Sequence, residues 1–349
     1  LVSVAPGAAI PALVPLLANA REKERRAYRV IIGRAARSDD GREALRRVLE
    51  QADLSPAVTL DLLRAAGSVL SSFGDAAHRA FARLATDTSP FRLRFLLLGP
   101  AAELSEEDGA ARAFLRGALT GDKSPYVRAE AARVLRTPRP FYAELSRAAE
   151  DTDVRVREAA VVAIGVGRID EAADRLVYRL ERDPWPFVRV AAAHSLAALG
   201  ANAAADTALR KVITEDEAPD VRRAAILAVG VRRVAAAAKI VRDRFQDRQE
   251  VDSVRAAAAL SLGLMCDAAS ADALTEQAVR LVSPTADETE RRVAESALSA
   301  LGLLHPADLA RRVAPLTGKT VPGPMRRLAT AALAAKGRCA DAVPKSPAR

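Results

Sequence analysis

The sequence predicts an all-α protein, a right-handed stack of paired helices along nearly its whole length. Three observations predict this fold: a composition that favours helices, a phrase that recurs about every 33 residues, and an apolar spacing within each copy that fits one face of a helix. A chain of 349 residues is also too long for one compact core of ordinary size, which favours a repeat array.

The composition favours helices over strands. Half of the residues are apolar, yet aromatic residues make up only 4%. The abundant Ala, Leu and Arg are among the best helix formers, whereas strands favour β-branched and aromatic residues. The net charge of +9 is compatible with an acidic partner such as nucleic acid or anionic lipid. No apolar run approaches the roughly 20 residues of a membrane span.

The recurring phrase is Val-Arg-x-Ala-Ala, followed three residues later by a small residue and then by Leu, Ile or Val. Clear copies begin at Val156, Val188, Val221 and Val254, and looser copies begin at Arg25, Val58, Phe91, Val127, Glu290 and Met325. Ten such copies leave no room for another domain. We expect residues 1–20 to be a partial N-terminal repeat or cap, 21–339 to be the repeat array, and 340–349 to be a flexible tail.

Each copy predicts a pair of helices. Counting the first residue of the phrase as position 0, the apolar residues at positions 0, 3, 4, 7, 8 and 11 form one stripe along a helix, here called the anchor helix. A first amphipathic helix, such as 171–181 or 203–214, precedes it across an acidic or Pro-containing turn. A lone pair of this kind cannot bury its apolar faces, so neighbouring pairs must stack.

The turn Asp, Val-Arg, Ala-Ala and Ala-Leu-Gly elements of these copies resemble HEAT repeats, in particular the short bacterial variety that also occurs in phycobilin lyases. The resemblance covers roughly residues 21–335. It implies an α-solenoid of about ten two-helix repeats that form a right-handed superhelix. It also implies that the anchor helix is the second helix of each pair and lines the concave surface.

Nine of the ten copies carry Arg at position 1, and most have an acidic residue a few positions upstream. The resemblance implies a ladder of Asp and Arg side chains from repeat to repeat. Physically, Asp near a helix N-terminus is favoured by the helix dipole, and a guanidinium group can bridge two such groups. We therefore expect a structural role for Arg128, Arg157, Arg189, Arg222 and Arg255, and for Asp153, Asp183, Asp220 and Asp252.

The outward positions of the anchor helices predict a binding groove. Positions 2, 5 and 9 should point outward, with position 6 marginal, and in the central copies they carry small and branched apolar residues. Such a row on successive helices would form a shallow groove for a protein or peptide. The expected contact residues are Val161, Val162, Trp185, Val190, His194, Ile226, Leu227 and Leu260. In the alternative interpretation, these side chains pack between repeats.

Two other functions stay open beside this non-enzymatic scaffold. Basic residues outside the ladder cluster at 21–47, at 222–248 and after 319, and could bind nucleic-acid phosphates, although acidic residues interrupt the first two clusters. Some HEAT-like proteins are DNA glycosylases, so nucleic-acid binding is the first alternative. The second is lyase-like handling of a tetrapyrrole, which the resemblance implies by fold-level analogy.

No sequence motif predicts catalysis, a cofactor or a metal site. His78, His194 and His305 lie in different copies, so no histidine cluster is expected to hold a metal. There is no phosphate-binding loop and no nucleophile elbow. Cys266 and Cys339 lie two copies apart. At about 8–10 Å per helix layer, their separation would be roughly 20 Å, which is beyond the reach of a disulfide unless the tail folds back at 336–338.

Overall fold

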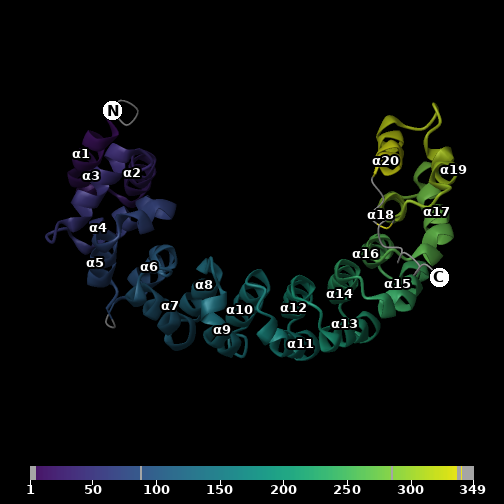
Figure 1. Cartoon of the computed structure of the whole chain (residues 1–349), viewed down its shortest axis with the longest axis horizontal. Helices are drawn as coiled ribbons and strands as arrows, with labels where there is room; N and C mark the ends of the chain where they lie inside the picture. Colours follow the sequence, from purple (N-terminus) through teal and green to yellow (C-terminus); the bar gives the residue numbers. More distant parts are fainter. Residues whose placement is uncertain (1–4, 87–88, 284–285, 336–338, 340–349) are drawn as a thin grey trace, which may run out of the picture. The chain divides into compact units, whose positions relative to one another are not determined.

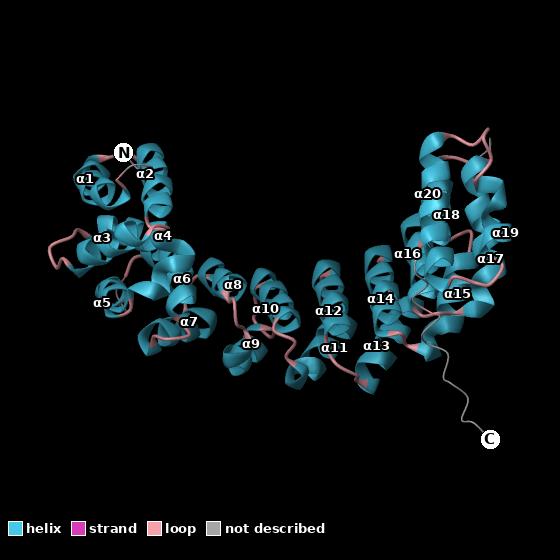
Figure 2. Ribbon diagram, turned by 45° about the horizontal axis from the view of Figure 1, so that its top comes forward, coloured by secondary structure: helices cyan, strands magenta, loops and turns pink. Residues whose placement is uncertain are grey.

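The regular elements of the chain are helices. The computed structural model describes residues 5–86, 89–283, 286–335 and 339, and within them it contains 3-10 and α-helices but no strand (Figure 2). The prediction of an all-α fold is confirmed. No helix within this described part is both long and apolar enough to cross a membrane.

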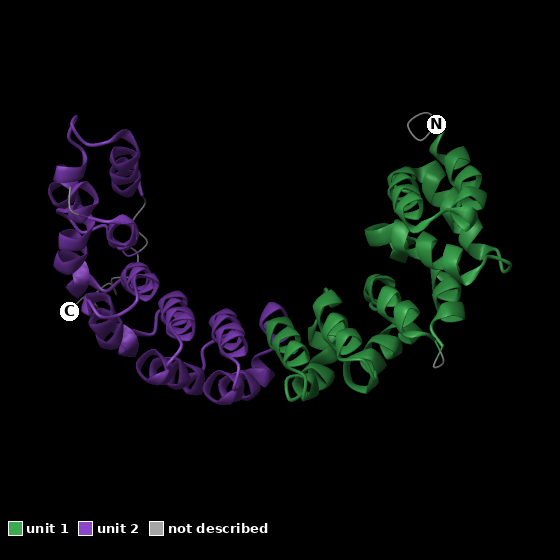
Figure 3. Cartoon of the chain, turned by 180° about the vertical axis from the view of Figure 1, so that it is seen from behind, with its two compact units in different colours: residues 1–163 green, residues 164–349 purple. Residues whose placement is uncertain are grey.

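The chain divides into two compact units, unit 1 at residues 1–163 and unit 2 at residues 164–349 (Figure 3). The helices of unit 1 are α1 (Pro6–Asn19), α2 (Glu22–Ala35), α3 (Asp39–Glu50), α4 (Pro56–Ala66), α5 (Asp75–Leu84), α6 (Phe91–Leu104), α7 (Gly109–Gly121), α8 (Pro125–Val134) and α9 (Tyr142–Ala148). The unit boundary falls within α10 (Val154–Val166). The helices of unit 2 are α11 (Ala173–Arg182), α12 (Pro186–Ala198), α13 (Ala203–Glu215), α14 (Pro219–Arg232), α15 (Ala238–Gln246), α16 (Asp252–Leu264), α17 (Ala271–Val279), α18 (Glu288–Leu304), α19 (Leu309–Val313) and α20 (Gly323–Ala334).

The even-numbered helices are the anchor helices of the repeat. In unit 2, α11 packs on α12, α13 on α14 and α15 on α16, so each anchor helix is the second member of its pair. The position 0 residues Val188, Val221 and Val254 are fully buried. Each pair buries its apolar stripe against its partner and against the neighbouring pairs, as the spacing predicts.

Local sequence signals fix where these helices begin and end. Pro186 and Pro219 stand in the first turns of α12 and α14, where a missing backbone N–H costs nothing. The side chain of Asn202 caps α13 by accepting a hydrogen bond from the N–H of Ala205. The C-cap of α14 is Arg233, which adopts the left-handed conformation.

The N-terminal segment, expected to be a partial repeat or cap, contains helix α1, part of which is buried. Helix α1 packs on both α2 and α3, in the same way as the later first helices contact their partners and neighbours. Ile10 and Leu17 of α1 are fully buried. Helix α1 is therefore packed into unit 1, and the assignment of residues 1–20 as a partial repeat or cap stays a prediction. The expected flexible tail at 340–349 lies outside the described residues.

Within unit 2 the anchor helices form the more tightly packed layer. Contacts between α12, α14 and α16 are closer than those between α11, α13 and α15. The even-numbered helices accordingly lie on the inner side of the curved unit, and the odd-numbered helices on its outer side (Figure 1). Small residues permit this approach, because a Cβ atom added at Gly263 would lie 2.7 Å from the Cα atom of Ala300 on α18.

The two cysteines form a disulfide, contrary to the expectation from helix spacing. The Cα atoms of Cys266 and Cys339 are 5.4 Å apart, and the Cys339 sulfur lies 3.6 Å from the carbonyl oxygen of Gly263 on α16. The prediction placed Cys339 in its own layer of the stack. Instead, Cys339 follows the end of α20 and lies against the end of α16. The distance between the two cysteines is therefore not the number of intervening helix layers multiplied by their spacing.

Candidate functional site

The exposed face of the unit 2 anchor helices carries a row of apolar side chains. The unit 2 face, as named here, consists of Val190, His194, Leu227, Val231, Leu260 and Leu264 on α12, α14 and α16. Val231 is 60% exposed and His194 is also exposed, while the other four are half-buried. These residues occupy positions 2, 6 and 10, and their four-residue spacing places them in line along each helix.

Val161 and Ile226, at position 5, were expected on this exposed surface but are fully buried. The reason for Ile226 is the close packing between α14 and α16, where the Ser261 hydroxyl donates a 2.9 Å hydrogen bond to the Ile226 carbonyl oxygen. Each anchor helix is covered on its sides by its neighbours, which buries position 5 and leaves position 6 open. Val161 and Ile226 are therefore packing residues, and the expectation that they contact a partner is wrong.

Val162 is 45% exposed on α10 and belongs to unit 1. It occupies position 6, the same position as His194, Leu227 and Leu260 in unit 2. Its role as a contact residue stays a prediction, separate from the unit 2 face.

Two exposed aromatic residues flank the start of α12. Trp185 is 51% exposed and Phe187 is 42% exposed, and their ring centroids are 5.7 Å apart. The Trp185 backbone N–H donates a 3.1 Å hydrogen bond to the Asp183 carboxylate, and Pro186 follows in the first helical turn. These contacts hold the aromatic pair one turn before Val190. Large aromatic side chains held in this way are common at the centre of protein interfaces.

His194 is the titratable group at the centre of the α12 row. Partial burial lowers its pKa below the usual value, and the nearby positive charge of Arg223 on α14 lowers it further. The imidazole is therefore neutral at pH 7 and compatible with an apolar surface. No group of three or more His, Cys, Asp or Glu side chains that could hold a metal occurs in the described part of the chain.

The position 1 arginines pair with acidic residues, but mostly not with those expected. Arg189 donates two hydrogen bonds to the Asp216 carboxylate, at 2.8 and 2.9 Å, and a third to the carbonyl oxygen of Asp183. Arg222 is bidentate with Glu250 in the same way and also binds the Asp216 carbonyl oxygen. Each of these arginines thus joins the turn before its own anchor helix to the following turn.

Unit 1 contains a similar bridge, and the remaining expected ladder residues have other partners. Arg128 is bidentate with Asp151 and binds the Asp122 carbonyl oxygen, while Arg157 donates to the carbonyl oxygens of Asp151 and Thr152. The expected aspartates form shorter-range pairs: Asp153 with Arg155, Asp183 with Arg179, Asp220 with Arg223, and Asp252 with Arg255. Of the four expected aspartates, Asp252 pairs with an arginine at position 1, namely Arg255 of its own repeat. The carboxylates of Asp151, Asp216 and Glu250, which accept hydrogen bonds from Arg128, Arg189 and Arg222, lie four or five residues before the next anchor, and Asp183 stands at the same place before Val188.

The basic cluster at 222–248 is largely neutralised within unit 2. Arg232 pairs with Asp206, Arg242 with Asp267, and Arg244 with Glu250, at distances of 2.7, 2.7 and 3.3 Å. Charges already paired with carboxylates attract nucleic-acid phosphates weakly. This pairing does not favour nucleic-acid binding by the cluster.

Two residues of the unit 2 face, Val231 and Leu264, were missed by the sequence analysis. Both occupy position 10, whereas the analysis counted position 9 as outward. The sequence contained the information needed to find them, because residues four apart lie on the same face of a helix. Positions 2, 6 and 10 therefore share one face. Position 9 is instead Gly230 or Gly263, where the neighbouring helix approaches too closely for a larger side chain.

The comparisons with known proteins agree with this architecture. Residues 113–197, 142–230 and 207–302 each match the family model described as HEAT repeats, and together they cover more than half of the chain. A search of curated proteins found no match.

Several solved structures have a similar fold. The structure of a Kap95:Nup1 complex has 14% sequence identity and a TM-score of 0.58 over 94% of this chain and 56% of the other. A structure of Kap95p with RanGDP has 12% identity and a TM-score of 0.55, over 90% of this chain and 49% of the other. Escherichia coli YibA has 18% identity and a TM-score of 0.49, over 80% and 97%. The chain spans about half the length of the Kap95 chains it matches.

The helix pairs, the recurring arginine bridges and the family match over residues 113–302 lead to one assignment. The chain belongs to the HEAT-repeat family.

Proposed function

We propose that the protein is an interaction scaffold and that unit 2 binds a protein or peptide through the unit 2 face. The observation that carries this proposal is the row of exposed and half-buried apolar side chains at positions 2, 6 and 10 of α12, α14 and α16. An exposed row of this kind on neighbouring helices is typical of interaction surfaces.

The geometry favours an amphipathic helix or an extended segment as the bound element. Leu227 and Val231 lie one turn apart on α14, and Leu260 and Leu264 repeat the arrangement on α16. A partner with apolar side chains at matching spacing would cover both rows. Trp185 and Phe187 lie at one end of the α12 row, where their rings would add contact area. The HEAT-repeat fold is commonly used for protein–protein interaction, and the Kap95 structures have RanGDP and Nup1 as partners.

The test is selection of binding peptides from a random display library on the purified chain, followed by titration of the selected peptides. Trp185 is the single tryptophan of the chain, so its fluorescence reports binding next to the unit 2 face without a label. We expect the selected peptides to carry apolar residues at helical spacing and to shift the Trp185 emission to shorter wavelength.

The Leu227→Ser/Val231→Ser variant should weaken these peptides by about tenfold or more, because each lost apolar contact is worth roughly 1 kcal/mol or more. Tyr178→Ser on α11 is the matched control, since Tyr178 is 52% exposed in the other helix layer. Equal affinity of the peptides for the double variant and for the wild type would reject the unit 2 face. Circular dichroism of both variants checks that the fold is retained.

A further inference from the structure

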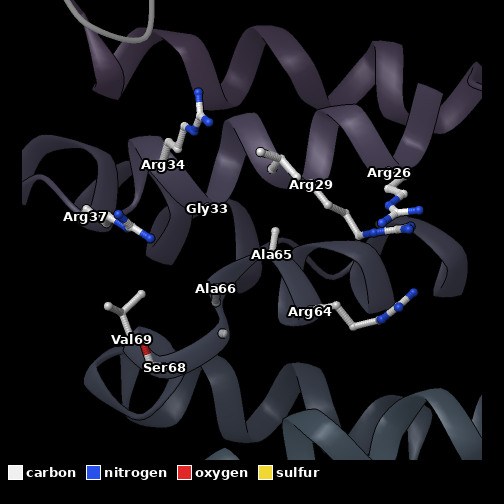
Figure 4. Close-up of a pocket in the computed structure, with 12 residues that line it drawn as sticks. Arg26, Arg29, Gly33, Arg34, Arg37, Arg64, Ala65, Ala66, Ser68 and Val69 are labelled. Carbon is white, nitrogen blue, oxygen red and sulfur yellow. The ribbon is translucent and has the colours of Figure 1, made fainter. Parts of the chain in front are cut away.

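Unit 1 contains a hollow lined by five arginines. It has a volume of about 650 Å³ and lies between α2, the end of α4 and the following 3-10 helix, η1 (Gly67–Phe73). Toward one end lie Arg26, Arg29 and Arg64, and toward the other lie Arg34 and Arg37 (Figure 4). The positive charges are thus distributed along the hollow and do not converge on one point.

Small residues and a turn create the space. A Cβ atom added at Gly33 on α2 would lie 2.6 Å from the carbonyl oxygen of Ala65, so the two helix backbones nearly touch at the floor of the hollow. Helix α4 ends at Ala66, and the following Gly67 has a φ of 52°, which suits glycine and redirects the chain into η1. Ser68 and Val69 of η1 then line the opposite wall.

Most of this positive charge is uncompensated. The buried carboxylate of Asp61 pairs with Arg29 at 2.6 Å and with Arg25 outside the hollow, and Glu22 lies 3.3 Å from Arg29. In contrast, the guanidinium groups of Arg26, Arg34, Arg37 and Arg64 have no carboxylate partner among the residues that the structure describes. Burial lowers the pKa of Arg64, and the nearby charge of Arg29 lowers it further, while the carboxylates of Asp61 and Glu22 partly offset these effects.

A second hollow of about 410 Å³ adjoins the basic one between α2, α4 and α6, and is called the apolar hollow here because most of its exposed surface is apolar. Leu60, Leu93 and Leu96 line it beside the charged residues Glu22, Arg25, Asp61 and Arg92, whose carboxylates pair with arginines of the same wall. Arg29 and Arg64 belong to the walls of both hollows. The same ligand can therefore place anionic groups over the arginines and apolar groups against the leucines.

We propose that this surface of unit 1 is a second docking site, specific for a peptide segment that combines carboxylate side chains with apolar ones. Carboxylates accept paired hydrogen bonds from guanidinium groups, and the spread of the arginines suits an extended chain better than a compact anion. The apolar hollow supplies contacts that a free phosphate or a nucleic-acid backbone would not use. The basic hollow also has no aromatic side chain on which a base could stack.

The binding test uses labelled synthetic peptides with the full chain. A short peptide of Glu and Leu is compared with one in which Lys replaces Glu, and with one in which Ser replaces Leu. Single-stranded and duplex oligonucleotides and inorganic phosphate complete the set. We expect the Glu/Leu peptide to bind at least about tenfold more tightly than every other probe, the size expected from one charge-assisted hydrogen bond or one buried leucine.

Two variants locate the site. Arg34→Gln/Arg37→Gln should weaken the Glu/Leu peptide about tenfold or more. Both side chains are exposed and pair with no described carboxylate, so the fold should be retained. Leu93→Ser should weaken the Glu/Leu peptide and leave the Glu/Ser peptide unchanged. The matched control is Arg46→Gln/Arg47→Gln, which removes the same two charges from α3, where both arginines pair with Glu43.

Three results would overturn the proposal. Equal loss of binding in the Arg46/Arg47 control would show unspecific attraction to net charge. An oligonucleotide or phosphate that binds as tightly as the Glu/Leu peptide would replace the proposed ligand by a phosphate-bearing one. Equal binding of the Glu/Leu and Glu/Ser peptides would show that the apolar hollow does not contribute to binding, which contradicts the proposed combination of charged and apolar contacts. These variants lie in unit 1, so their outcome is independent of the test on the unit 2 face.

Discussion

The Ser261 hydroxyl on α16 donates a hydrogen bond to the carbonyl oxygen of Ile226 on α14, which is a contact between the anchor helices of neighbouring repeats. Both residues are fully buried. The contact is possible because Gly230 brings no side chain between the two helices: a Cβ atom there would lie 2.8 Å from that of Ser261. The repeat-to-repeat distance in the inner layer therefore depends on single small residues.

Gly230→Ala should destabilise unit 2 by about 1–3 kcal/mol, because an added methyl group overpacks this contact. Gly117→Ala is the matched control. Gly117 lies inside α7 with no atom within 4 Å of an added Cβ, so the same change should stabilise by about 0.5–1 kcal/mol. Urea denaturation followed by circular dichroism measures both. Equal effects of the two changes would contradict the close approach of α14 and α16.

Ile226→Ser and Leu227→Ser should affect stability differently although the residues are adjacent. Ile226 is completely buried, so the substitution should cost about 2–5 kcal/mol, whereas half-buried Leu227 should cost markedly less. The free energy of unfolding of each variant checks this. A larger loss for Leu227→Ser would invert the assignment of packing and surface positions.

Asp216→Asn should destabilise unit 2 by about 3 kcal/mol, because it breaks a buried pair and leaves Arg189 without its carboxylate. Asp220→Asn, four residues later, removes an equal charge from a side chain that is 71% exposed, and should change stability by less than about 0.5 kcal/mol. Thermal unfolding of the two variants at one pH is the measurement. Similar melting temperatures would argue against the turn-to-turn bridge.

The sequence was sufficient for the periodic features and insufficient for the contacts between repeats. Val188, Val221 and Val254 were identified as core because each repeats the same helical stripe. Ile226 was predicted to be exposed, but the neighbouring helix α16 buries it. The close approach of α16 depends on Gly230 and Ser261. The apolar stripe of a helix predicts which side packs on its partner helix. It does not predict which other residues are buried by the anchor helices of neighbouring repeats.

The partners of the arginine bridges could not be predicted from the sequence for a similar reason. The sequence indicated that Arg189 and Arg222 have a structural role. It did not indicate that their salt-bridge partners are Asp216 and Glu250. Charge and capping preferences act locally and pointed to the nearer aspartates. The observed partners lie 27 and 28 residues along the chain, a distance that only the stacking of repeats brings together.

Acid should destabilise the protein between about pH 4.5 and pH 2. Burial alone would raise the pKa values of Asp122, Asp151 and Glu250, but hydrogen bonds from Arg94, Arg128 and Arg222 outweigh it and lower them. A hydrogen bond from Arg155 lowers the pKa of Asp153 to about 2.

Groups with depressed pKa values stabilise the fold above their unfolded-state pKa and lose that contribution as the pH falls through the folded-state value. The melting temperature should therefore decline from about pH 4.5 downward. A melting temperature that stays constant over this range would contradict the sign of the shifts.

Cys266→Ser/Cys339→Ser should lower the stability of unit 2. The disulfide spans 73 residues, and the chain-entropy model gives an upper estimate of about 4 kcal/mol for a closed loop of this size. Denaturation with and without a reducing agent is the measurement. The wild type should become less stable on reduction while the double variant does not change. Identical curves for oxidised and reduced wild type would contradict a stabilising bond.

A linear array of repeats ordinarily unravels from its ends, since a terminal pair has a neighbour on one side alone. The bond between Cys266 and Cys339 encloses α17, α18, α19 and α20 in one covalent ring that closes at the end of α16. If α19 and α20 separate from the stack, the disulfide still holds both ends of the ring together. The separated segment therefore gains less conformational entropy than a segment with a free end would gain. Oxidation thus ties the four helices α17 to α20 to the end of α16, and reduction of the disulfide releases them.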